Sequence, residues 1–555
     1  MVQTGSKESS DQAAWLRRHA EEFAQQRKES FTTSSSREVR AVYTPEDLPE
    51  HWYRDAIGLP GEAPWTRGET ATGYRGELWG WEFYAGFGSA KEANARYRYL
   101  LEQGSTGGVS IALDLPTQIG MDADHRLAAN ETGKVGVALN TIEDVLDLFD
   151  GIDLESAHRI FTTANCIGPI AFAWFWLLCE HRGIDPHSIV VTIQNDPLKE
   201  YVARGTQFLP VPASARLAAD VVEHCTNEQL PWLPISVSGS HMKQAGGTCV
   251  HEAAFTLANA VCYADELHRR GVAASEFAPR MELHFCTDMD FFEEIAKYRV
   301  IRRVWGQLLR DRYGAPDVAP RLHAATSGLP LTAQQPKNNI IRITLQALAQ
   351  ILGGVAQTRT ASYDEALAIP TEDAVKLSIR TNQIIAYETG IADIVDPLGG
   401  SWYLERLTLE IFDEVQSILQ RVEKMGGALA AVESGWFATE LADSAYRQQE
   451  ELERGDRVIV GINRFVEDDS DDIKLFKLNP EAAMSQRRRL AEFKARRDAK
   501  RLAEAMDALR ATVRDGRNCV PFVIEAVRVG ATVGEISDLW RQELGEYHPQ
   551  AQWLT

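Results

Sequence analysis

Polar side chains end or follow several short apolar runs of this 555-residue sequence. The groups are Thr192 with Gln194, Ser238 with Ser240 and His241, His323, and Thr360 with Ser362. Hydroxyl, amide and imidazole groups can hold a polar ligand through hydrogen bonds, and histidine can also exchange a proton near neutral pH. Each group taken alone is explained as well by a strand cap or a loop hydrogen bond. Four of them in series favour a shared polar site.

A second candidate for chemistry is the stretch RGELWGWEFYAGFGSA at 75–90. It places Glu77 and Glu82 on either side of two tryptophans and continues into Tyr84. A tyrosine and two carboxylates beside an aromatic patch combine charge, hydrogen bonding and a large apolar surface. This combination suits a binding site, but the residue types alone do not identify its ligand.

The elements that must position these groups alternate between strand-like and helix-like patterns. Seven apolar runs of strand type occur at 109–115, 158–163, 188–193, 234–239, 281–286, 321–326 and 356–361, and amphipathic stretches such as 253–271 and 338–354 separate them. Strands that alternate with helices pair in parallel, and this number of units predicts an α/β fold, a (β/α)8 TIM-type barrel over residues 46–410. The eighth strand has no clear pattern, and a doubly wound open sheet is the alternative. In such a barrel the carboxyl ends of the strands carry the chemistry.

The two ends of the chain differ from this centre. Residues 1–45 are polar and predict an N-terminal arm, and residues 411–555 predict a helical C-terminal region. Within that region, 483–513 has apolar residues on one helix face and eight basic residues from Arg487 to Arg501 on the others. A solvated surface and a docking surface for an acidic partner both fit this pattern.

The composition excludes several classes of protein. A net charge of −21 disfavours a nucleic-acid-binding protein, because phosphate backbones require clustered positive charge. No apolar run approaches the ~20 residues that cross a bilayer, and the N-terminus lacks an apolar signal core, so we expect a cytoplasmic protein with no membrane partner. The seven scattered cysteines have no metal-ligand spacing, so we expect reduced thiols and no metal. Motifs of phosphate loops, zinc proteases and nucleophile elbows are absent.

Seven collinear motifs give the sequence a specific resemblance. They are YAGFGSAKEANARYRYLLEQG (84–104), ALDLPTQIGMDADH (112–125), TIQNDPLKEYVARGT (192–206), SGSHMKQAG (238–246), FAPRMEL (277–283), TSGLPLTAQ (326–334) and DEALAIPT (364–371). Together with TVGEISDLW (532–540) they resemble the methylmalonyl-CoA mutase family over roughly residues 45–545.

The resemblance implies an adenosylcobalamin-dependent radical mutase. In that family a (β/α)8 barrel binds the acyl-CoA substrate and admits its pantetheine arm into the bore. A separate flavodoxin-like domain binds cobalamin through a DxHxxG histidine, and no such motif occurs near the C-terminus of this sequence. We therefore expect a large subunit that pairs with a small cobalamin-binding subunit as an α2β2 heterotetramer. A G-protein chaperone for cofactor loading is a further expected partner.

The resemblance also assigns roles to individual residues. It implies that His241, Tyr84 and Arg204 are catalytic, with His241 donating a hydrogen bond to the thioester carbonyl. The substrate contacts it implies are Gln194, Thr192, Thr72, Tyr74, Arg75, Ser110, Arg280 and His323. The cofactor contacts it implies are Glu365, Ser362 and Ala112.

Tyr84 and Arg204 bear on the choice of substrate. Methylmalonyl-type relatives have this tyrosine and this arginine. Isobutyryl-type relatives have phenylalanine and hydroxyisobutyryl-type relatives isoleucine at the first position, and both have glutamine at the second. A buried carboxylate needs a partner such as arginine, so we expect the interconversion of methylmalonyl-CoA and succinyl-CoA first. Ethylmalonyl, isobutyryl, hydroxyisobutyryl or 3-hydroxybutyryl esters, a carrier-protein thioester and a non-catalytic barrel subunit are the alternatives.

The sequence also departs from the family pattern. Glu77 and Glu82 stand where the family usually has arginines that face the coenzyme A phosphates, and a carboxylate there would repel them by about 1 kcal/mol or more per contact. The other departures are Ser240 for a tyrosine, Glu282 for a serine, Ala325 for a glutamine and Leu329 for a tryptophan. The two glutamates therefore predict weakened coenzyme A contacts.

Overall fold

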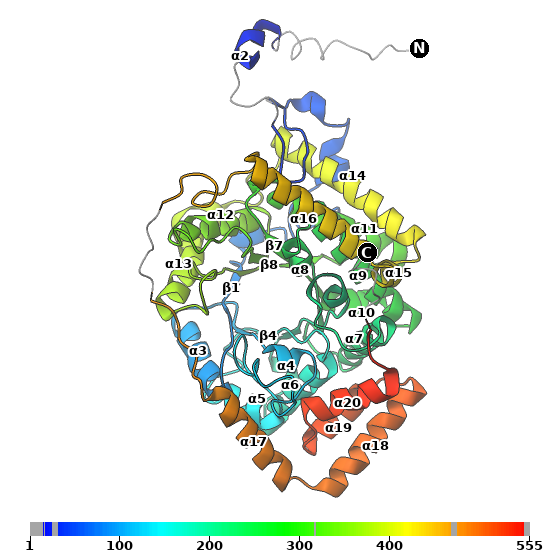
Figure 1. Ribbon diagram of the computed structural model, residues 1–555. Coiled ribbons are helices and arrows are strands. Elements are labelled where there is room, and N and C mark those ends of the chain that lie inside the picture. Colours follow the sequence, from blue (N-terminus) through cyan, green and yellow to red (C-terminus); the bar gives the residue numbers. More distant parts are fainter. Residues whose placement is uncertain are drawn as a thin grey trace.

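A ring of parallel strands forms the centre of the computed structural model, which describes residue 15 and residues 17–24, 31–40, 42–315, 318–467 and 474–548 (Figure 1). The strands are β1 (Gly80–Glu82), β2 (Tyr84–Ala85), β3 (Val109–Ile111), β4 (Ile160–Thr162), β5 (Val191–Ile193), β6 (Ile235–Ser238), β7 (Met281–Thr287), β8 (Arg321–Thr326) and β9 (Gln357–Arg359). One sheet has the order β1-β9-β8-β7-β6 and the other β2-β3-β4-β5, and every pair is parallel.

The two sheets join at both edges. β1 and β2 are halves of one strand interrupted at Phe83, so β9 pairs with its first half and β3 with its second. On the far side, Leu233 just before β6 bridges Thr192 of β5, and its amide donates to the Val191 carbonyl at 2.8 Å. Eight strands therefore close into a ring. The (β/α)8 barrel is confirmed, the open sheet is wrong, and the strand that the sequence pattern missed is the aromatic stretch before Tyr84.

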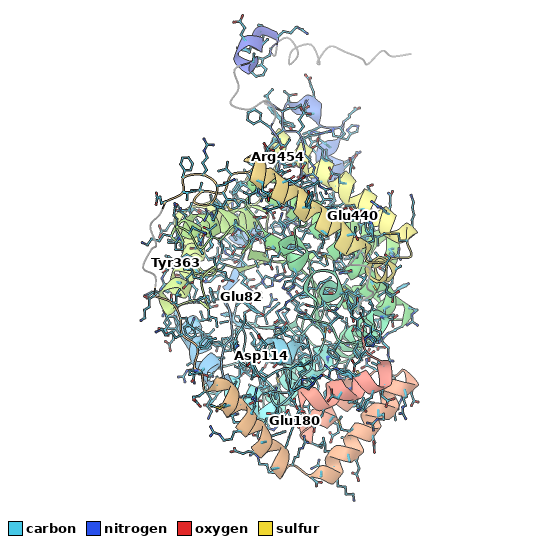
Figure 2. The ribbon with its side chains drawn as sticks, viewed as in Figure 1. Glu82, Asp114, Glu180, Tyr363, Glu440 and Arg454 are labelled. Carbon is cyan, nitrogen blue, oxygen red and sulfur yellow. The ribbon has the colours of Figure 1, made fainter. Side chains whose placement is uncertain are left out.

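The missing strand alternates strictly between the outside and the inside of the barrel. Trp79, Trp81 and Phe83 are buried in the outer apolar core between strands and helices. Glu82 and Tyr84 face the bore, and Figure 2 shows Glu82 within the ring of strands. Successive side chains of a strand point to opposite faces, so the tryptophans anchor the strand while the acid and the phenol line its interior.

Helices surround the ring and shield its apolar outer face from solvent. Those between and after the strands are α3 (Ala90–Glu102), α4 (Leu115–Gln118), α5 (Ile142–Leu148), α6 (Gly168–Arg182), α7 (Val211–Asn227), α8 (Ser240–Gln244), α9 (Cys249–Arg269), α10 (Ala274–Phe277), α11 (Phe291–Tyr313), α12 (Asn338–Leu352) and α13 (Glu372–Glu388). Short helices are α2 (Ala20–Ala24), η1 (Pro45–Asp47), η2 (Tyr53–Ile57), η3 (Gly73–Arg75), η4 (Pro186–Ser188), η5 (Glu200–Arg204), η6 (Ala278–Arg280) and η7 (Ile391–Asp393). Capping boxes at Ser89, Thr141 and Thr248 start α3, α5 and α9, each satisfying free backbone amides.

Helices also form the described part of the chain after residue 401, apart from its connecting loops. They are α14 (Trp402–Lys424), α15 (Ala428–Glu433), α16 (Trp436–Arg454), α17 (Ala482–Arg496), α18 (Ala499–Asp515), α19 (Val520–Arg528) and α20 (Val533–Leu544). α14 packs on α9 and α11, whereas α17 to α20 lie on the opposite side of the barrel, with α19 against α6 (Figure 1). In the N-terminal segment Arg37 pairs with Glu293 of α11 at 2.5 Å and with Glu414 of α14 at 2.6 Å. None of the described helices combines the length and apolar character that a bilayer crossing requires.

The basic residues of α17 and its C-terminal end bind this same chain. The partners are the Ala123 carbonyl for Arg487, Asp144 and Asp147 for Arg489, Asp122 and Asp124 for Lys494, Glu143 for Arg496 and Glu535 for Arg497. Five of the eight cations therefore fasten the C-terminal helices to the barrel. For those five, the structure supplies partners within the chain, and docking of an acidic partner at this surface stays a prediction.

Asp122 is buried where the C-terminal helices attach to the barrel. Replacing Asp122 should weaken this attachment. Its carboxylate accepts from Thr532 Oγ1 at 2.7 Å and from the Gly534 amide at 2.8 Å, and it lies 3.0 Å from Lys494 Nζ. Asp122→Ala leaves these groups unpaired, so we expect a loss of about 2–4 kcal/mol in the free energy of unfolding. Asp124→Ala removes a half-exposed partner of the same lysine and should cost less than about 1 kcal/mol. Thermal unfolding of both variants checks this, and equal losses would contradict it.

Candidate active site

Tyr84 lies at the carboxyl end of its strand under an arginine. Its hydroxyl is 2.8 Å from Thr163 Oγ1, just beyond β4, and the guanidinium of Arg359 lies 4.6 Å from the centre of its ring. A cation over an aromatic face is stabilised by the ring quadrupole, and the hydrogen bond fixes the phenol. The tyrosine is therefore held in place from two sides, with part of its surface still exposed to the barrel mouth.

His241 lies in the first turn of α8, directly after β6. Its Nδ1 is buried and has no hydrogen-bond partner among the described residues, so the loop-cap interpretation does not hold for this atom. Burial, followed by the positive charges of Lys199, Arg204 and Arg359, lowers the pKa of the imidazole well below its ordinary value. The ring is thus neutral at physiological pH and keeps hydrogen-bonding capacity for a ligand.

Gln194 is held by a buried lysine. Lys199 Nζ donates to Gln194 Oε1 and lies 3.8 Å from Glu200. Burial lowers the pKa of Lys199 to about 8, while Glu200 and Asp196 oppose this shift. Since the amide oxygen of Gln194 is occupied, its NH2 group is the end that remains to donate. Thr192 Oγ1 on the same strand is buried without a partner among the described residues.

Arg204 ends the single-turn helix η5 and reaches across to α4. Its guanidinium donates to Gln118 Oε1 at 2.6 Å and lies 3.8 Å from Glu200. Gly205 follows with φ of +74°, a conformation that side chains with a Cβ disfavour. The Arg204 side chain is 30% exposed, so its planar fork keeps donors for an anion.

These groups come from the ends of three strands, β2, β5 and β6, which closure of the ring brings to one mouth of the barrel. A guanidinium there can pair with a carboxylate, while a neutral imidazole and an amide can donate to a nearby carbonyl. Fixed donors in a site with little water stabilise charge that develops on such an oxygen. The arrangement therefore suits a substrate that carries both an anionic group and a reactive carbonyl.

The three residues expected to touch a cofactor also lie at this mouth. Ala112 directly follows β3, and an added Cβ on Gly86 would come within 2.1 Å of the Ala112 carbonyl oxygen. Ser362 and Glu365 lie in the loop after β9, where Ser362 donates to Asp364 at 2.6 Å and Glu365 is exposed. Exposed leucines of the loops after β3 and β8 are Leu115, Leu127 and Leu329. Exposed apolar side chains around a strand-end mouth fit a broad ring system such as a corrin.

A cavity of about 850 Å³ opens at the other, amino-terminal mouth of the barrel. Thr72, Tyr74 and Glu77 line it, and the Tyr74 hydroxyl donates to the Val355 carbonyl at 2.8 Å. Arg75 and Arg280 are not part of its lining. Arg280 instead donates to the backbone carbonyls of Leu230 and Glu276, at 3.1 and 2.7 Å. The expected contacts Thr72 and Tyr74 thus line one cavity, whereas Arg75, which follows Tyr74 in η3, and Arg280 lie outside its lining.

Charged side chains fill the bore between the two mouths. Glu82 accepts from Arg359 at 2.8 Å, and Arg359 also donates to Ser110 at 3.1 Å. His323 lies 3.6 Å from Glu82 and 3.3 Å from Glu282, which pairs with Arg159 at 2.9 Å. The expectation that Glu82 faces a phosphate is wrong, because its carboxylate lies inside the barrel. Glu77 does line the amino-terminal cavity.

Paired cations decide the ionisation of these acids. Although burial acts to raise it, the charge of Arg359, with that of Arg159 and of His323 when it is protonated, holds the pKa of Glu82 below its ordinary value. Arg159 and His323 do the same for Glu282. Burial lowers the pKa of His323 despite both acids. The acids are therefore ionised and the histidine neutral.

Three of the bore side chains also have the spacing of a metal site. Glu282, His284 and His323 each offer a ligand atom within 4.8 Å of the others. Arg159 and Ser236 donate to Oε1 of Glu282, at 2.9 Å each, so a cation at this site would lie beside a positive guanidinium.

Comparison with known proteins agrees with this architecture. Residues 32–546 match the Methylmalonyl-CoA mutase family. The chain belongs to the methylmalonyl-CoA mutase family. It is therefore an isomerase of a family whose members depend on cobalamin.

Individual relatives cover most of the chain. The 2-hydroxyisobutanoyl-CoA mutase large subunit of Aquincola tertiaricarbonis is 40% identical over 94% of both chains. The methylmalonyl-CoA mutases of Rhizobium meliloti (strain 1021) and Escherichia coli (strain K12) are 37% and 36% identical, over 92% and 93% of this chain and 72% of their own.

Sequence reasoning missed several residues around the mutase site. They are Lys199 behind Gln194, Gln118 beside Arg204, Thr163 beside Tyr84, and Arg159, Phe161 and Arg359 in the bore. A usable signal existed for the bore residues, since period-two alternation in the strand runs places each of them on the inward face. The missed partners behind the site have no such pattern.

The neutrality of His241 is directly measurable. Because burial lowers its pKa well below the ordinary value of about 6.5, its ring signal should not titrate between about pH 8 and pH 6. Selectively labelled histidine followed by NMR, with His241→Asn for assignment, tests this. Exposed His187, whose pKa is raised by its hydrogen bond to Asp185, is the control and should titrate within that range. A midpoint near 6.5 for His241 would contradict a desolvated ring.

Proposed function

We propose that the chain is the substrate-binding large subunit of an adenosylcobalamin-dependent mutase that moves the thioester carbonyl of a dicarboxylic acyl-CoA to the adjacent carbon, with methylmalonyl-CoA and succinyl-CoA as the first pair. The observation that carries this proposal is Arg204 with free donors at the same barrel mouth as neutral, unpartnered His241. One group suits the free carboxylate of the substrate and the other its thioester oxygen.

Each residue of the site has a defined part in this proposal. Arg204 binds the free carboxylate, and Gln118 orients the guanidinium. His241 donates to the thioester carbonyl, and Gln194, fixed by Lys199, donates from its amide. Tyr84 packs beside the migrating group. Arg204, His241, Gln194 and Tyr84 surround one barrel mouth, where exclusion of water would protect a reactive intermediate from side reactions.

The cofactor and the partner complete the proposal. Adenosylcobalamin supplies the radical that starts the rearrangement, and Ala112, Ser362, Glu365 and the exposed leucines would hold it at the carboxyl mouth. One relative carries the name large subunit, which supports a small-subunit partner. In the proposal that partner binds cobalamin, and the assembly is α2β2. We divide the chain into an arm (1–45), a barrel (46–410) and a C-terminal region (411–555) that docks this subunit. A cytoplasmic location and a G-protein chaperone for cofactor loading belong to the same proposal.

A second substrate class has one specific observation in its favour. The 40% identity over 94% of a 2-hydroxyisobutanoyl-CoA mutase large subunit favours a hydroxyacyl monocarboxylic ester. Arg204 opposes it, because a monocarboxylic acyl group leaves the guanidinium only Glu200, which Lys199 shares, as counter-charge. An activity assay decides between the two substrate classes. It contains the chain, the small subunit and adenosylcobalamin, and it compares methylmalonyl-, ethylmalonyl-, isobutyryl- and 3-hydroxybutyryl-CoA as substrates. Absence of succinyl-CoA from methylmalonyl-CoA overturns the first choice.

Arg204→Gln should separate the two substrate classes. The variant loses the carboxylate partner, so kcat/KM for methylmalonyl-CoA should fall about 100-fold, equivalent to roughly 3 kcal/mol. A monocarboxylic ester should change less than about threefold. Arg204→Lys keeps the charge but not the planar fork, so its kcat/KM for methylmalonyl-CoA should lie between those of the unmodified chain and Arg204→Gln. An equal loss on both esters would show that Arg204 supports the fold around Gln118 instead.

Glu77→Arg tests the amino-terminal cavity as the site of the coenzyme A phosphates. Removing a repulsive carboxylate and adding a cation should lower KM for the acyl-CoA about fivefold, since such contacts are worth about 1 kcal/mol. Glu62→Arg, an exposed acid outside the cavity lining, is the matched control and should leave KM unchanged. An unchanged KM in Glu77→Arg would place the phosphates elsewhere.

A further inference from the structure

The bore of this barrel is filled along its length. The cavity at the amino-terminal mouth reaches Arg159, and the catalytic mouth begins at Tyr84. Between them six inward side chains, here called the gate, contact one another. The gate residues are Glu82, Arg159, Phe161, Glu282, His323 and Arg359.

The contacts of the gate run without interruption from one mouth to the other. Arg159 binds Glu282 at 2.9 Å, Glu282 lies 3.3 Å from His323, and His323 lies 3.6 Å from Glu82. Glu82 binds Arg359 at 2.8 Å, and Arg359 lies 4.6 Å from the ring centres of both Phe161 and Tyr84. This series of contacts therefore lies across the bore, between the two mouths that a ligand arm would have to connect.

The charges of the gate cancel within it. Two arginines face two ionised glutamates, and the histidine between them is neutral. Separating a buried pair leaves an uncompensated charge in a medium of low polarity, which is costly, whereas moving a pair together is not. The gate therefore opens by displacement of whole ion pairs, and Arg159 already borders the open amino-terminal cavity.

Polar atoms of the gate are also left without partners. Glu82 Oε2, Arg159 Nε and His323 Nε2 are buried and make no hydrogen bond within the described structure. Buried donors and acceptors normally find partners, so these atoms mark places where a ligand with amide groups would be stabilised. The arm of a coenzyme A ester has amides of this kind.

We infer that the gate lies across the path of the thioester arm and that its residues set the affinity of this chain for acyl-CoA substrates. This inference rests on the proposed function, in which the acyl group reaches Tyr84 and His241 while the nucleotide stays at the amino-terminal cavity. Binding then includes the cost of displacing Glu82 with Arg359 and Glu282 with Arg159. The gate residues therefore set the affinity for acyl-CoA substrates, although they do not touch the reacting atoms.

The test compares two probes that differ only in the pantetheine arm. Coenzyme A has this arm, and adenosine 3′-phosphate 5′-diphosphate (the bisphosphate with the second 5′-phosphate of coenzyme A) lacks it. The variant tested combines Glu82→Ser with Arg359→Ser. Neither residue lines the amino-terminal cavity. Calorimetry should give about tenfold tighter binding of coenzyme A and unchanged binding of the nucleotide that lacks the arm. Asp220→Ser with Arg270→Ser, an ion pair on the outer helices, is the control and should change neither.

Two safeguards keep the result decisive. Glu82→Gln with Arg359→Gln removes the charges and retains most of the side-chain bulk, so this variant should fold even if the serine pair does not. It should also bind coenzyme A more tightly than the unmodified chain, by a smaller factor than the serine pair. Unchanged or weaker binding of coenzyme A in a folded variant overturns the inference. The change in affinity for coenzyme A relative to the nucleotide that lacks the arm does not depend on the choice of acyl group, because neither probe has an acyl group. Failure of the proposed substrate therefore does not affect this test.

Discussion

Inside a closed barrel, every charged side chain must find its counter-charge among the other inward-facing residues. Water and the surrounding helices cannot supply it, since the strands separate the bore from both. In this chain two carboxylates meet two guanidinium groups around a neutral histidine, and the remaining inward positions accommodate them. Ser110 and Ser236, for example, supply hydroxyl donors or acceptors to the charged groups. Charge pairing in the bore thus constrains residues on most strands of the ring.

The same rule of pairing distinguishes supporting groups from functional ones. Lys199, Gln118 and Thr163 are engaged with neighbours and fix the side chains in front of them. His241 and Arg204 keep hydrogen-bonding capacity at the mouth of the barrel. The site is therefore a small set of free donors that hydrogen-bonded neighbours hold in place, and this arrangement suits an anionic thioester.

Much of the fold was predictable, because period-two runs separated by amphipathic helices define a parallel barrel and the end that carries its site. The strand 80–85 escaped recognition because its inward residues are glycine, glutamate and tyrosine, which resemble a solvated face. The partners of α17 escaped for another reason. Arg489 and Lys494 bind acids more than 340 residues earlier, and no local pattern encodes such pairings. The role of Glu82 could not be predicted for the same reason. Its partner Arg359 lies far away in the sequence and becomes a neighbour only when the ring of strands closes.

The segment 118–122 joins the C-terminal helices to the substrate pocket. At one end Asp122 and the carbonyls of Ile119 and Gly120 are held by Thr532, Gly534 and Arg541 of the α20 region. At the other end Gln118 holds Arg204. Hydrogen bonds at both ends of five consecutive residues therefore connect α20 to the guanidinium. Any effect of a ligand at α20 on affinity for a ligand at Arg204 would have an equal effect in the opposite direction.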